Sequence, residues 1–114
     1  MMQEKLKIRY TDSFDRDLDE TAYYISNDLH NPDAADRFLS EVETAIEEQR
    51  SHDPEIFAVY AYSADTSLPY YRILVVNFIV LYVIIEEDGE SIMEMRRILY
   101  GRRNISLLIF NGKV

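Results

Sequence analysis

The chain has 114 residues, of which 47% are hydrophobic and 29% are charged, and this balance is typical of one soluble folded domain spanning residues 1–114. The formal net charge of −9 argues against general electrostatic attachment to nucleic acid or to an anionic membrane. The sequence contains no cysteine and no apolar stretch long enough for a signal peptide or a membrane-spanning helix, so we expect a cytoplasmic protein without disulfides or thiolate metal sites.

A short strand is predicted near the start of the chain, over residues 5–10. Polar and apolar residues alternate there with a period of two, which is the pattern of a strand with one buried side. Leu6, Ile8 and Tyr10 share the side that we expect to face the core, and basic residues take the other side.

Two helices are predicted next, over residues 12–29 and 32–50. Suitable capping residues precede both helices: Thr11 or Asp12 for the first, and Asn31, followed by Pro32 at the first helical position, for the second. Each helix carries one apolar stripe, made of Phe14, Leu18, Ala22, Ile25 and Leu29 in the first and of Ala35, Phe38, Leu39, Val42, Ala45, Ile46 and Gln49 in the second. The short break between the helices predicts an antiparallel hairpin.

The helical half of the chain is strongly acidic. Residues 12–55 hold 14 of the 21 acidic residues and 3 of the 12 basic ones, so this half has a net charge of −11 and the rest of the chain has a net charge of +2. Two interpretations stay open. The acids form the solvated outer sides of amphipathic helices, or they form a surface that mimics nucleic acid or binds a basic partner.

Three further strands are predicted over residues 71–76, 78–85 and 92–99, because each segment is rich in apolar and β-branched side chains. Asn77 suits a tight turn after the first of them, and an Asp-Gly pair at residues 88–89 suits a two-residue hairpin loop before the last. The three strands therefore form an antiparallel meander.

The remaining segments are a polar loop over residues 51–69, which holds a short strand near Val59, and an apolar stretch at residues 105–110 that packs as a short helix or an added strand. The order of the elements predicts an α+β fold. It consists of an N-terminal strand, an antiparallel two-helix hairpin and then a three-stranded antiparallel meander, with the helices packed on one face of one twisted sheet.

Several segments together carry a resemblance to a known family: residues 14–18 with 24–25, 31–35 with 37–39, 71–73, 77–82 and 97–104. In their order and spacing they resemble the RelE/ParE toxin superfamily of type II toxin–antitoxin systems, the plasmid stabilisation type. The resemblance implies a toxin that arrests growth, uses no cofactor, and forms an oligomer with a cognate antitoxin that neutralises it.

The resemblance also implies two possible activities. RelE-like members cut mRNA inside the ribosome, whereas ParE-like members poison DNA gyrase and are not nucleases. Arg72 matches a basic position at the start of the first meander strand, and Arg102 and Arg103 match a basic pair after the last strand. These three arginines are therefore the candidate catalytic residues of a ribosome-dependent mRNA endoribonuclease.

Other positions depart from the nuclease pattern. Leu74, Val76 and Ile79 stand where RelE-like nucleases usually carry basic residues, and the C-terminal segment has no Tyr or His to act as a general acid. Each missing group costs about two orders of magnitude in rate or more. We therefore favour a ParE-like, non-nuclease toxin, for which gyrase is a target implied by the resemblance alone, and disfavour direct nucleic-acid binding. An unknown target, a weakened toxin and a module without toxicity that only binds partners stay open.

The densest basic cluster is formed by Arg96, Arg97, Arg102 and Arg103, with Tyr100 beside them. One interpretation is a binding surface for an antitoxin's acidic tail, a phosphate group or a target protein, because guanidinium groups bind such anions bidentately. The alternative is that Arg97 or Arg102 pairs with the acidic helices inside the domain.

A metal site is not expected, because the only two histidines, His30 and His52, have no partner at the spacing of a metal-ligand motif.

Overall fold

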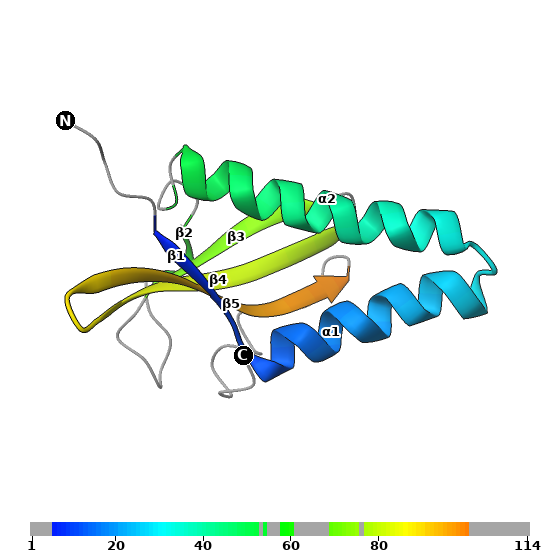
Figure 1. Cartoon of the computed structure of the whole chain (residues 1–114), viewed down its shortest axis with the longest axis horizontal. Helices are drawn as coiled ribbons and strands as arrows, with labels where there is room; N and C mark the ends of the chain where they lie inside the picture. The colour runs from blue at the N-terminus through cyan, green and yellow to red at the C-terminus, as the bar shows by residue number, and fades with distance from the viewer. Residues whose placement is uncertain (1–5, 53, 55–57, 61–68, 76, 101–114) are drawn as a thin grey trace.

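The computed structural model describes residues 6–52, 54, 58–60, 69–75 and 77–100. The elements in chain order are β1 (Lys7–Tyr10), α1 (Asp12–Tyr23), the π-helical segment η1 (Tyr24–Asp28), α2 (Pro32–Ser51), β2 (Ala58–Tyr60), β3 (Tyr70–Val75), β4 (Phe78–Glu87) and β5 (Glu90–Tyr100). Figure 1 shows the two helices lying side by side along one face of the sheet, which confirms the predicted α+β fold. The predicted element at residues 105–110 lies outside the described residues.

The sheet has the strand order β1-β5-β4-β3-β2. β3, β4 and β5 form the predicted antiparallel meander, and β2 confirms the short strand expected near Val59. β1 pairs with β5 in the parallel direction, so the sheet as a whole is mixed. The long hairpin between β4 and β5 turns at Asp88 and Gly89, whose φ angles of 53° and 77° are those of the predicted Asp-Gly loop.

Both helices begin at the predicted caps. The Thr11 hydroxyl accepts a hydrogen bond from the Phe14 amide at 3.1 Å, and the Asn31 side chain accepts one from the Ala34 amide at 3.1 Å. Pro32 occupies the first position of α2 as expected. Within the described residues, neither helix is both long enough and apolar enough to cross a membrane.

The end of the first helix differs from the prediction. The last turn is π-helical, and the amide of Leu29 donates to the carbonyl of Tyr24 at 3.1 Å. A π turn contains more residues than an α turn, so it shifts the phase of the side chains that follow. Leu29, predicted to lie on the buried stripe, is therefore 54% exposed, and the chain reverses at His30 with a φ of 52°.

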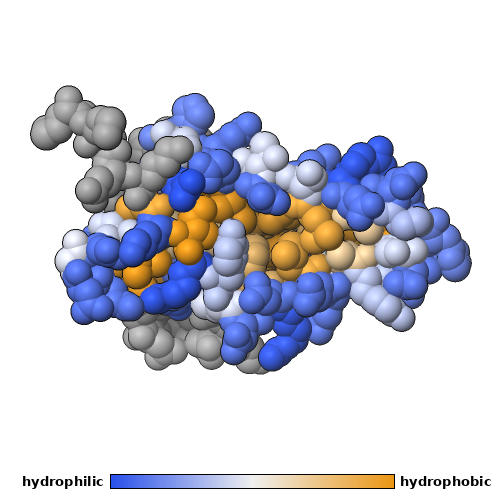
Figure 2. All heavy atoms as spheres, in the orientation of Figure 1, coloured by the Kyte–Doolittle hydropathy of each residue, from blue (hydrophilic) through white to orange (hydrophobic). Residues whose placement is uncertain are grey.

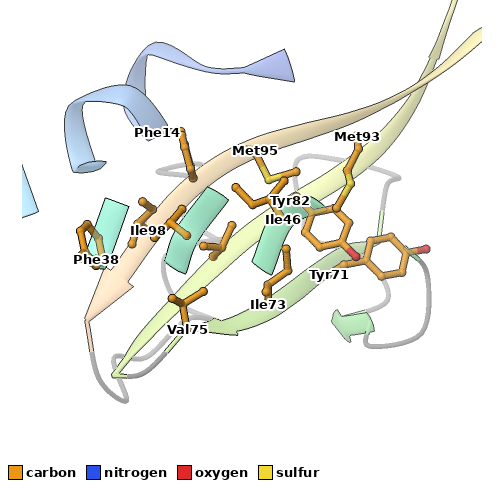
Figure 3. Close-up of a cluster of buried hydrophobic side chains, with 12 residues drawn as sticks. Phe14, Phe38, Ile46, Tyr71, Ile73, Val75, Tyr82, Met93, Met95 and Ile98 are labelled. Carbon is orange, nitrogen blue, oxygen red and sulfur yellow. The ribbon is translucent and has the colours of Figure 1, made fainter. Parts of the chain in front are cut away.

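The core lies between the helices and the sheet (Figure 3). Its buried members are Phe14, Phe38, Val42 and Ile46 from the helices and Tyr71, Ile73, Val75, Val80, Tyr82, Met93, Met95 and Ile98 from the sheet. Leu6 and Ile8 pack against this cluster as predicted. Tyr10 was predicted to face the core but is 46% exposed, because it is the last residue of an edge strand; its ring still packs 5.3 Å from that of Phe14.

A Gly89→Ala variant is expected to lose about 1 kcal/mol of unfolding free energy. The φ of 77° disfavours a side chain, whereas nothing lies within 4 Å of the added Cβ, so the cost is conformational and not steric. Urea unfolding measures the loss. Asp88→Asn is the control, since asparagine tolerates the same left-handed backbone; an equal loss in both variants would contradict the argument.

Candidate functional site

Arg97, one of the predicted binding residues, is bound to helix α1. Its Nε lies 2.6 Å from Oδ2 of Asp17, and its Nη2 donates to Oδ1 of the same carboxylate at 3.1 Å. Oδ2 of Asp17 also accepts the backbone amide of Ile98 at 2.9 Å. The two side chains are 22% and 13% exposed, so the pair is largely shielded from water. Arg97 therefore has the internal pairing with the acidic helices that the sequence left open as an alternative.

The position of this pair follows from the uneven lengths of the strands. β1 pairs with β5 only as far as Met95, and the remaining edge of β5 runs alongside α1. The Thr11 amide donates to the carbonyl of Met95 and its hydroxyl to that of Arg96, both at 3.1 Å. One and a half turns later Asp17 reaches the amide of Ile98. Groups at the start of α1 thus form hydrogen bonds with backbone atoms of β5 that a longer β1 would otherwise have bonded.

Arg96 is held in a second charged network. Its Nε lies 2.6 Å from Oε1 of Glu94, its Nη1 donates to the Tyr70 hydroxyl at 3.2 Å, and its guanidinium carbon lies 5.9 Å from the centre of the same ring. The other oxygen of Glu94 is 2.7 Å from Arg9, which also contacts Glu87 at 3.1 Å. The hydrogen bonds that Arg9 donates to Glu94, and then to Glu87, raise the pKa of Arg9. A buried carboxylate is therefore shared by two guanidinium groups.

Tyr100 and Arg72 are more accessible. Tyr100 is 62% exposed at the end of β5, and its ring meets that of Phe78 edge-on at 5.3 Å. Arg72 is exposed on β3. Leu81 on β4 pairs with Arg72 on one side and with Arg97 on the other, so the two arginines lie in one row, with backbones about 10 Å apart. The Arg97 guanidinium, however, is engaged by α1.

Arg72 lines an open groove of about 470 Å³ between β3 and the end of α2. Glu48, Gln49 and His52 lie on the helical side of this groove, and Nδ1 of His52 is 2.7 Å from the carbonyl of Glu48. An arginine beside an imidazole can bind an anionic group, but the carboxylate of Glu48 on the same wall opposes it.

Of the predicted site residues, the structure describes Arg72, Arg96, Arg97 and Tyr100. Arg102 and Arg103 lie outside the described residues, and no group of three His, Asp or Glu side chains suited to a metal ion occurs in the part of the chain that is described. The prediction missed the carboxylate partners of the last-strand arginines. The sequence could have predicted that Glu94 has a partner. It lies between Met93 and Met95 in an apolar strand, and a charged side chain that is buried there requires an oppositely charged neighbour.

Comparison with known proteins gives one family match. The model described as "ParE toxin of type II toxin-antitoxin system, parDE" matches residues 8–105, a range that extends from the second residue of β1 past the end of β5. No curated protein matches the chain.

Removing the Asp17 carboxylate is expected to destabilise the fold. An Asp17→Ala variant should lose about 2 kcal/mol of unfolding free energy, since Arg97 and the Ile98 amide both lose their acceptor. Asp19→Ala is the control, because it makes the same change in helix propensity at an exposed position of the same helix. It should change the unfolding free energy by less than about 0.5 kcal/mol. Chemical denaturation compares them, and similar stabilities would show that the pair contributes little.

Proposed function

The chain belongs to the ParE toxin family of type II toxin–antitoxin systems, and on this premise we propose that it is a non-nuclease toxin that binds DNA gyrase. A cognate antitoxin holds it inactive. The choice of gyrase rests on the likeness to ParE-like toxins, while the choice of a non-nuclease mechanism is supported by the environment of the arginines on the last strand.

The pairing of Arg96 and Arg97 with carboxylates is the observation that carries the non-nuclease part of this proposal. Metal-free cleavage of RNA needs cations that stabilise the charge developing on the phosphate. Both arginines already contact carboxylates that are only 11% and 13% exposed, those of Glu94 and Asp17. Turning either arginine toward a phosphate would remove a positively charged partner from a nearly buried carboxylate, and this is energetically costly.

The neighbouring positions support contact with a protein. Leu74 stands where a nuclease would carry a cation and is 63% exposed, and Tyr100 is 62% exposed at the end of β5. Exposed aromatic side chains are typical of protein–protein contacts, whereas an exposed leucine contributes nothing to phosphate binding. The net charge of −9 also opposes approach to the dense phosphate of a ribosome.

One observation favours a second candidate function, the ribosome-dependent endoribonuclease. Arg72 is exposed and shares its groove with His52, whose imidazole is a suitable proton donor or acceptor. In this alternative, Arg72 acts together with Arg102 and Arg103.

Induced expression of the chain in a bacterium without its antitoxin separates the two functions. We expect growth arrest, a DNA damage response and altered plasmid supercoiling, with transcripts left intact. Two variants serve as controls: Arg72→Ala, and a double variant carrying Arg102→Ala and Arg103→Ala. Transcripts should be equally intact in cells that express either variant, because a gyrase toxin does not use these residues to cleave RNA. Plasmid topology and transcript ends are mapped in the same cultures.

New transcript ends inside translated messages would contradict the proposal, particularly if Arg72→Ala reduced the cleavage by about 100-fold or more. Normal growth of cells that accumulate the folded protein would also contradict it, and would identify a binding module without toxicity.

A further inference from the structure

A second surface lies at the far end of the helical hairpin, where η1 leads into α2. Tyr23, Tyr24 and Leu29 are 66%, 51% and 54% exposed there, and we call these three side chains the tip patch. Figure 1 shows this end of the hairpin extending past the ends of the described strands. The tip patch is separate from the open groove of about 330 Å³ between α1 and α2, because none of its three residues lines that groove.

The π turn places two members of the tip patch on one side of the chain. The amide of Leu29 donates to the carbonyl of Tyr24, five residues earlier, so the two side chains lie one π turn apart. The amide of Asn31 then donates to the carbonyl of Ile25 at 3.1 Å and closes the turn into α2. The backbone beneath the patch is therefore hydrogen-bonded, and it presents the exposed side chains from a regular structure and not from a loose loop. Single π turns of this kind are frequent at functional sites.

The composition of the tip patch is that of a protein-binding surface. Single exposed apolar side chains are ordinary, but here three large ones lie within residues 23–29. Tyrosine offers a large contact area at a small loss of side-chain entropy, and it is one of the residues most enriched among the strongest contributors to protein–protein binding. The two adjacent tyrosines are therefore the expected anchors of an interface.

The surroundings of the tip patch are acidic. Residues 19–36 contain five acidic residues and no Lys or Arg, and Figure 2 shows hydrophilic side chains around this end of the molecule. Asp19 and Glu20 lie one helical turn before the two tyrosines, and Asp28 is the last residue of η1. All three carboxylates are exposed, and none forms an ion pair within the described part of the chain. Their charges are thus available to a partner.

We propose that the tip patch is the surface through which this chain docks on its target protein, and that the matching surface of the target carries Lys or Arg residues. Cationic side chains are attracted to the faces of tyrosine rings, and they gain further from the carboxylates around the patch. The identification of the target as gyrase rests on the proposed function, whereas the position and charge of the surface rest on the tip alone. Proteins that bind DNA carry basic surfaces, so gyrase offers surfaces of the required charge.

The same charges argue against other occupants. A second copy of the chain docked tip to tip would bring two acidic surfaces together, and like charges brought together at an interface are unfavourable. Nucleic acid and anionic membrane surfaces meet the same repulsion. A basic protein surface gains complementary charge in addition to contact with the aromatic rings.

Binding of the purified full chain to purified gyrase, measured by calorimetry at low and high salt, tests the surface. A double variant carrying Tyr23→Ser and Tyr24→Ser should bind about 10-fold more weakly or worse, with an unchanged circular dichroism spectrum. The control carries Tyr10→Ser and Leu39→Ser, which remove apolar side chains that are 46% and 38% exposed outside the tip patch. Binding by the tyrosine variant as tight as that of the control would overturn the proposal.

A second pair of variants tests the charge. Asp19→Asn together with Glu20→Gln should weaken binding by about 5-fold at low salt and by less at high salt. Glu41→Gln together with Glu43→Gln makes the same change in net charge at exposed positions of α2, outside the tip. Equal weakening in the two pairs would show attraction to the whole acidic hairpin and would contradict a specific surface at the tip.

Growth arrest in cells that express the same variants separates the surface from the identity of the target. If the unchanged chain arrests growth but does not bind gyrase, only the gyrase assignment fails. The tip patch is then supported if the tyrosine variant alone loses the arrest, and it is overturned if that variant, present as folded protein, arrests growth fully. A chain that neither binds gyrase nor arrests growth has no target to dock on, and this outcome would overturn both proposals.

Discussion

The architecture depends on which groups form hydrogen bonds with the backbone of β5 at the edge of the sheet beyond the end of β1. Backbone groups in a sheet need hydrogen-bond partners, and beyond Met95 those partners come from Thr11 and Asp17 at the start of α1 instead of from another strand. These bonds fix α1 along the sheet edge. The position of α1 in turn sets the hairpin over the core, the width of the groove between the helices and the direction of the Arg97 side chain.

This arrangement separates the charges of the molecule. Arg96 and Arg97 lie on the sheet, where they form ion pairs with Glu94 and Asp17. Part of the basic cluster that stands out in the sequence is therefore engaged in contacts within the protein. The hairpin carries most of the acids, and many of these face water. This separation of charges supports our proposal that the chain, a member of the ParE toxin family, acts on a protein and not on RNA.

Local signals predicted most of the fold. Side-chain caps, an Asp-Gly loop and apolar periodicity depend on neighbours in sequence, and the elements they predicted are present with shifts of one or two residues. The parallel pairing of β1 and the π turn before Leu29 depend on tertiary packing and were not predicted. The sequence shows the arginine cluster but not the partner of Arg97, because Asp17 lies 80 residues away and nothing in the local pattern connects the two.

The central claim is that Arg97 belongs to the frame of the protein and does not bind phosphate. The NMR signal of its Nε–H group, followed while a short single-stranded RNA is added to the folded protein, tests this directly. The Nε–H group donates to Asp17 at 2.6 Å, so the account predicts slow exchange with water and a frequency that RNA does not move. Rapid exchange, or a saturable shift on addition of RNA, would contradict it.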